Sequence, residues 1–211
     1  MLGLNQEPSR KIIIASEIND DVAGQVIASI IEVNAYDEMI LSDSKSYQPL
    51  PIEMYITSGG GSATAGFAII GAMEMSSTPI VTYGLGIVAS MALGIFVSGD
   101  YRISSRFTRY MYHSVAYGTM GNIKDHEDAL KESDIMQRMY NSLFEDTGIT
   151  KEMMKLARDK KEDLFFSPSK AKEYKLVDFI LDKPEKRLST EEVTTEAIME
   201  FYEGLVDKEE V

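Results

Sequence analysis

The sequence contains no cysteine and no tryptophan, and only two of its 211 residues are histidines. The missing cysteines exclude disulfides, thiolate metal sites and a cysteine nucleophile, and they fit a reducing compartment. Any imidazole base must therefore be His113 or His126. A chain of this length buries a sizeable core without cross-links. We expect neither a metal site nor a cofactor.

Clusters of basic residues and long apolar runs are also missing. The net charge is -13 and the pI is near 4.6, so the surface repels nucleic-acid phosphates. Glycine, serine and threonine interrupt the apolar segments, which are too short to span a bilayer. The N-terminus lacks the basic and apolar regions of a signal peptide. We expect a cytoplasmic protein that binds neither nucleic acid nor a membrane.

Strand and helix patterns alternate along the chain, which favours an α/β fold with helices crossing over between strands of one sheet. Strands are predicted at residues 11–15, 51–56, 79–83, 101–104, 109–112 and 177–181. Helices are predicted at residues 63–75, 122–146 and 168–176, and two more are predicted to begin at residues 20 and 90. Residues 35–50 are polar and are predicted to form an exposed loop. The strand predicted at 79–83 leads through Gly84 and Gly86 into the helix that begins at Ser90.

The last part of the chain carries a capping box, Ser189–Glu192, which predicts a terminal helix. Its apolar stripe consists of Val193, Ala197, Ile198, Phe201 and Leu205. The remaining positions are strongly acidic. A solvated surface helix docked by one stripe is the simpler interpretation, and a partner-binding tail is the alternative.

Ser90 is a lone hydroxyl in the small, apolar run 84–94, where a helix is expected to begin. A serine becomes a nucleophile only when a base takes its proton. His113 ends a strand-like segment and is the better candidate base, because His126 lies in a run of charged residues typical of a solvated surface. The alternatives remain a packing role for Ser90 and a core role for His113.

The glycine run 59–61 follows a predicted strand and lets the main chain approach a reacting group closely. Backbone amides from this run and from Met91, just after Ser90, would stabilise the oxyanion of a tetrahedral intermediate. The run has neither the spacing of a dinucleotide-binding loop nor the Gly-Lys-Ser/Thr ending of a phosphate-binding loop. Phosphate binding is therefore disfavoured.

Four segments in order resemble motifs of the Clp protease proteolytic subunit (ClpP) family, over about residues 10–181. Residues 55–66 are similar to the family's Tyr-Ile-Asn-Ser-Pro-Gly-Gly segment, and residues 86–91 are similar to its nucleophile motif. Residues 112–113 are similar to its Met-Ile-His-Gln-Pro stretch, and residues 163–178 are similar to its last helix and strand. The resemblance implies an α/β, crotonase-like fold of repeated βαβ units with a protruding handle helix over 122–146.

The same resemblance implies a catalytic triad. Ser90 falls at the nucleophile, His113 at the general base and acid, and Asp163 at the carboxylate that orients the histidine. Gly61 and Met91 fall at the oxyanion-hole amides. Asp163 rests on the resemblance alone, because composition does not single it out from 34 acidic residues.

The implied function is a serine endopeptidase that cleaves short or unfolded polypeptides through an acyl-enzyme. Family members form two stacked seven-membered rings, a tetradecamer, which work with an ATP-driven unfoldase. The chain would then consist of a short N-terminal segment, 1–10, a ClpP-like peptidase domain, 11–183, and an acidic helical extension, 184–211. Because 1–10 is too short for the family's axial gate, we expect an open pore.

Several positions depart from the family pattern. Gly59 stands where proline is usual, Ser114 replaces the glutamine after the histidine, and Glu162 replaces an arginine that joins the rings. Residues 35–50 form an insertion. These departures fit a divergent member, such as a phage-encoded one. They keep open a catalytically silent ring subunit or scaffold, and the shared fold keeps open a crotonase-type acyl-CoA enzyme.

Overall fold

The computed structural model describes residues 7–116 and 118–181. The capping box at 189–192, the predicted terminal helix and the extension 184–211 lie outside the described residues. Of the predicted N-terminal segment, only residues 7–10 are described. Within the described ranges, no helix combines the length and the apolar character needed to cross a bilayer.

Three consecutive strand–helix–strand units build the first part of the fold, as the alternating pattern predicts. Their elements are β1 (Lys11–Ile14), α1 (Asp20–Asp43), β2 (Ile52–Ser58), α2 (Ala63–Glu74), β3 (Ile80–Ala89), α3 (Met91–Val97) and β4 (Tyr101–Ser105). The second part contains β5 (Arg109–Tyr112), α4 (Ile123–Ser142), α5 (Lys151–Lys160), β6 (Leu164–Phe166), α6 (Pro168–Glu173) and β7 (Phe179–Leu181).

The strands form one sheet in the order β1-β2-β3-β4-β7, and β5 and β6 branch from β3. All pairs are parallel except β5 with β6. The long strand β3 makes the branch possible: its first half pairs with β4, and its last residues, 87–89, pair with β5. The end of β3 therefore lies beside β5, where the candidate site is found.

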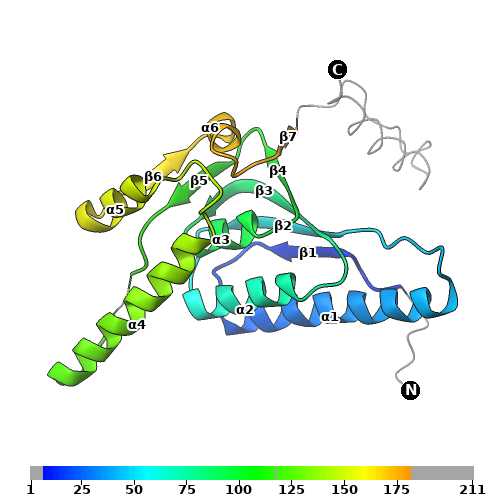
Figure 1. Ribbon diagram of the computed structural model, residues 1–211, viewed down its shortest axis with the longest axis horizontal. Helices are drawn as coiled ribbons and strands as arrows, with labels where there is room; N and C mark the ends of the chain where they lie inside the picture. Colours follow the sequence, from blue (N-terminus) through cyan, green and yellow to red (C-terminus); the bar gives the residue numbers. More distant parts are fainter. Residues whose placement is uncertain (1–6, 117, 182–211) are drawn as a thin grey trace. The chain divides into compact units, whose positions relative to one another are not determined.

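The core lies between the sheet and the helices that cross over it. Alternate residues of β2 are buried, as expected of a strand with one face against helices. Figure 1 shows α1 and α2 side by side along the sheet, whereas α4 extends away from it. The helix α3 is buried along its whole length.

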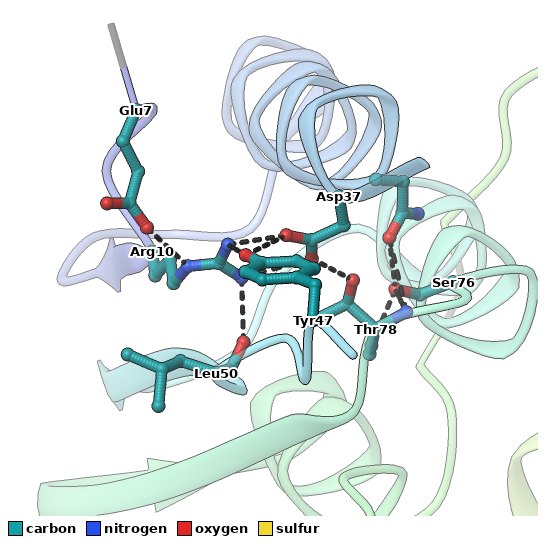
Figure 2. Close-up of polar contacts among 8 residues, drawn as sticks. Glu7, Arg10, Asp37, Tyr47, Leu50, Ser76 and Thr78 are labelled. Carbon is teal, nitrogen blue, oxygen red and sulfur yellow. Dashed lines mark hydrogen bonds and ion pairs between the residues drawn. The ribbon is translucent and has the colours of Figure 1, made fainter. Parts of the chain in front are cut away.

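The prediction of a loop at 35–50 was wrong for residues 35–43, because α1 continues to Asp43, whereas residues 44–50 belong to no helix or strand. A buried polar cluster holds this part of the helix (Figure 2). Asp37 is 1% exposed and accepts hydrogen bonds from the guanidinium of Arg10, the hydroxyl of Tyr47 and the hydroxyl of Thr78. These partners come from separate parts of the chain, so local polarity alone did not reveal that Asp37 is buried.

Two further differences concern the elements around the site. The predicted end of the third strand at Tyr83 was wrong, because β3 continues through Gly84 and Gly86 to Ala89. Neither α5 nor β6 was predicted from the sequence. The helix start at Pro168 is confirmed, with the Ser167 hydroxyl accepting a hydrogen bond from a backbone amide of the first turn.

Candidate active site

Ser90 joins β3 to α3 in a strained backbone conformation, with φ 54° and ψ -130°. Such a conformation costs a non-glycine residue about 1–3 kcal/mol and persists only where neighbouring contacts hold it. The Ser90 amide donates to the Met111 carbonyl at 2.9 Å, and the Ser90 carbonyl accepts from the Leu93 amide at 2.9 Å and the Tyr140 hydroxyl at 2.7 Å. The Ser90 side chain makes no capping hydrogen bond to α3. Its hydroxyl is therefore available to another group.

That group is His113, whose Nε2 lies 2.6 Å from Ser90 Oγ. The opposite ring nitrogen, Nδ1, lies 3.8 Å from Asp163 Oδ1, which is longer than a direct hydrogen bond. The side chain of Asp163 is 50% exposed, against 32% for that of His113. The serine–histidine contact is thus short and partly buried, whereas the histidine–aspartate contact is open to solvent.

Strand register accounts for the meeting of the three side chains. Ala89 pairs with Met111 in the parallel β3–β5 ladder, so Ser90 and His113 follow neighbouring strand ends. In the antiparallel β5–β6 ladder, Tyr112 pairs with Leu164. Extending that register by one residue sets Asp163 opposite His113. Because β6 was not predicted from the sequence, Asp163 could be assigned only by resemblance to the family.

The glycine run lies directly against Ser90. A Cβ added to Gly60 would stand 2.6 Å from Ser90 Cβ. On its other side the run is fixed by the Ile18 backbone, which donates to the Gly60 carbonyl and accepts from the Ser62 amide, both at 2.8 Å. Gly61 itself has φ +148°, and a Cβ there would lie 2.3 Å from the Ile18 carbonyl oxygen. Only glycine fits this position.

A pocket of about 550 Å³ opens beside the glycine run. Its lining includes Ser90, His113, Gly61 and Met91, so four of the five predicted site residues share it. Asp163 lines a neighbouring pocket of about 340 Å³, which also contains His113. Among the described residues, neither the Gly61 nor the Met91 amide donates to a protein acceptor. Both remain available to a bound group.

The C-terminal half of α4 supports the site from behind and was not predicted to do so. The rings of Tyr140 and Tyr112 stack with centroids 5.4 Å apart, and Tyr140 donates to the Ser90 carbonyl. Gln137 accepts from the Val115 amide at 2.7 Å, just beyond His113. Burial raises the pKa of Tyr140 well above its ordinary value and that of Tyr112 to about 12, so both hydroxyls stay protonated.

The remaining candidates lie apart from these contacts. His126 is exposed in the first turn of α4, as predicted for a solvated histidine. Gly59 has open space where a Cβ would stand, and Glu162 is exposed. Within residues 7–116 and 118–181, no three histidine, aspartate or glutamate side chains converge as a metal site would require.

Comparison with known proteins gives consistent matches over most of the chain. The Clp protease family profile matches residues 5–184. The ATP-dependent Clp protease proteolytic subunit 2 of Treponema pallidum is 30% identical over 178 residues, which are 83% of each chain. The proteolytic subunit of Pleurastrum terricola is 32% identical over 81% of this chain and 83% of its own. Subunit 2 of Corynebacterium efficiens is 32% identical over 85% and 86%, respectively.

A solved structure shares the fold. A mutant ClpP1 from Listeria monocytogenes superposes with a TM-score of 0.67 and 26% sequence identity, covering 82% of this chain and 92% of that one. The residues that the family profile matches, 5–184, include the sheet, its crossover helices and the segments that carry the candidate site.

Proposed function

The chain belongs to the Clp protease family, a family of peptidases, and we propose that it is a serine endopeptidase acting through Ser90, His113 and Asp163. The observation that carries the proposal is the 2.6 Å contact between Ser90 Oγ and His113 Nε2. The Ser90 hydroxyl neither caps its helix nor forms a hydrogen bond with the backbone, and it faces an imidazole. This is the arrangement of an activated nucleophile.

In the proposed reaction, Ser90 Oγ attacks the carbonyl carbon of the scissile peptide bond while His113 Nε2 takes the hydroxyl proton. The carbonyl oxygen becomes an oxyanion that accepts hydrogen bonds from the Gly61 and Met91 amides. The C–N bond then breaks, His113 gives its proton to the leaving amine, and an acyl-enzyme on Ser90 remains. Water, deprotonated by His113, releases the acid and regenerates the serine.

Asp163 would orient the imidazole so that Nδ1 keeps its proton and Nε2 faces Ser90. The 3.8 Å separation requires a small approach of the two side chains when a peptide is bound. Catalytic hydrogen bonds are often long in unliganded enzymes and shorten in the substrate complex. The same separation is the observation that favours the alternative, a catalytically silent ring subunit. A crotonase-type acyl-CoA enzyme is disfavoured, because the relatives are named as protease subunits.

The decisive experiment compares turnover of a fluorogenic peptide and of unfolded casein by the wild type and three variants. Ser90→Ala and His113→Ala should each lower kcat on the order of 10⁴-fold to 10⁶-fold, because only the oxyanion hole and substrate binding remain. His126→Ala is the matched control and should retain full activity. Activity of Ser90→Ala within tenfold of the wild type would refute the assignment, and an inactive wild type would favour the silent subunit.

We also propose that the protein assembles into rings, two of seven subunits stacked as a tetradecamer, in the cytoplasm. The relatives' names associate them with ATP-dependent proteolysis, which supports an ATP-driven unfoldase as partner. The helix α4 presents exposed apolar side chains suited to contacts between copies: Ile123, Leu130, Ile135 and Met139. Sedimentation should find a species far heavier than the 23.5 kDa chain, and a strict monomer at micromolar concentration would contradict the assembly.

A further inference from the structure

Glu17 lies at the rim of the candidate active site, although it is distant from Ser90 in the sequence. It immediately precedes Ile18, whose backbone is hydrogen bonded to Gly60 and Ser62 and whose side chain is fully buried. The Glu17 Cγ lies 3.0 Å from the position that a Cβ on Gly61 would occupy. The rigid pairing of Ile18 with the glycine run therefore holds Glu17 against the site.

Glu17 lines the pocket, and within the described part of the chain no neighbouring charge compensates its own. Glu17 is exposed and lines the same pocket as Ser90 and His113. Among the described residues, no cationic side chain lies within 4.0 Å of it, and no other acidic residue, lysine or arginine lines this pocket. The neighbouring pocket differs, because Lys161 and Asp163 give it one charge of each sign.

We propose that Glu17 determines specificity, by favouring peptides that carry lysine or arginine close to the scissile bond. This inference rests on the proposed peptidase function. A peptide that reaches Ser90 must pass along the Gly61 segment, and a cationic side chain there is attracted by Glu17 while an acidic one is repelled. A partly solvated pair of unit charges a few Å apart changes binding by about three- to tenfold.

The test uses sets of peptides that are identical except at one position, which is occupied by lysine, glutamine or glutamate. The varied position is moved in turn from three residues before the scissile bond to two residues after it. The wild type should cleave the lysine peptide about three- to tenfold faster, in kcat/KM, than the glutamine peptide at one or more positions. Raising the salt concentration should reduce the ratio of kcat/KM for the lysine peptide to that for the glutamine peptide. The reason is that salt screens the attraction between Glu17 and the lysine, which is exposed to solvent.

Substitutions then assign the preference to Glu17. In Glu17→Gln, the ratio of kcat/KM for the lysine peptide to that for the glutamine peptide should fall to about one. In Glu17→Lys, the glutamate peptide should become a better substrate than the lysine peptide. Glu38→Gln removes an exposed charge from α1, outside the pocket, and should leave the wild-type ratio intact. Reaction of Ser90 with a serine-directed phosphonate shows that each variant retains an assembled site.

The possible failures can be told apart. A wild type that cleaves all peptides equally, or a lysine preference that persists in Glu17→Gln, would overturn the role of Glu17 and leave the peptidase assignment in place. Cleavage of no peptide, together with an unreactive Ser90, would overturn the proposed function and this inference with it.

Discussion

Asp37 and Asp163 each face a basic side chain, yet their surroundings are opposite. Asp37 is 1% exposed and accepts hydrogen bonds of 3.0 Å from Arg10 and 2.8 Å from Tyr47, as well as one from Thr78 (Figure 2). The side chain of Asp163 is 50% exposed and reaches one basic partner, His113, at 3.8 Å. The first carboxylate is fixed by its partners, whereas the second lies beyond hydrogen-bonding distance of its partner.

The difference indicates two separate uses of the same side chain. A buried charge must be fully hydrogen bonded, because an unpaired one is costly, so Asp37 holds α1 to the segments before β1 and β3. A carboxylate that orients a catalytic imidazole needs access to the site and a modest freedom to approach. We therefore expect substitutions at Asp37 to affect stability and substitutions at Asp163 to affect turnover.

Exchanging each aspartate for asparagine should separate the two effects. Asp163→Asn should lower kcat by about 10²- to 10⁴-fold with little change in melting temperature, because the imidazole loses the group that fixes its tautomer. Asp37→Asn should leave Arg10 with the exposed Glu7 as its remaining ionic partner, and should lower the free energy of unfolding by up to about 3–5 kcal/mol. Peptidase kinetics and thermal melts measure the two quantities. The comparison fails if Asp163→Asn destabilises the fold as much as Asp37→Asn does.

Acid should disrupt the Asp37 cluster. Burial by itself would raise the pKa of Asp37, but hydrogen bonds from Arg10, Thr78 and Tyr47 outweigh it and hold the pKa below its ordinary value of 3.8. A carboxyl whose pKa is depressed in the folded state contributes stability above the pKa of the unfolded chain and loses it as the pH falls through the folded value. The melting temperatures of wild type and Asp37→Asn should therefore converge below about pH 4. A constant difference down to pH 2 would contradict this assignment.

A smaller effect is expected at Tyr140, which we regard as a positioning residue. Tyr140→Phe keeps the ring that packs on Tyr112 but removes the hydrogen bond to the strained Ser90 carbonyl. The loss of one such bond, about 0.5–1.5 kcal/mol, should lower kcat up to about tenfold without changing KM, and should slow phosphonate labelling of Ser90 in proportion. Tyr47→Phe is the matched control: it removes a hydroxyl from the Asp37 cluster and should alter stability but not kcat. Equal kcat in the two variants would remove Tyr140 from the site.

The sequence was sufficient for the order of the elements apart from α5 and β6, and it marked Ser90 and His113 as candidates. Alternating patterns predicted the βαβ units, and a lone hydroxyl in a small apolar run drew attention to Ser90. The end of α1 was missed because Asp37 and its neighbours look solvent-exposed when read locally. Its partner Arg10 is 27 residues away and Thr78 is 41 residues away, so the burial of Asp37 is set by tertiary contacts.

The site was only partly predictable for a related reason. Asp163 follows from the β5–β6 register, and the three-residue strand β6 is too short to give a clear pattern. Tyr140 and Gln137 lie on a helix that reads as polar, and nothing in their spacing distinguishes buried from exposed positions. Glu17 likewise looks like an ordinary surface residue until the pairing of Ile18 with the glycine run sets it beside the pocket.

The central claim is that His113 activates Ser90 as the nucleophile, and covalent labelling tests it most directly. A serine-reactive fluorophosphonate should add once per chain, at Ser90 and no other serine, when the modified protein is digested and mapped by mass spectrometry. The label should be absent from Ser90→Ala and strongly slowed in His113→Ala, while His126→Ala should label like the wild type. Labelling at a different serine, or undiminished labelling of His113→Ala, would contradict the account.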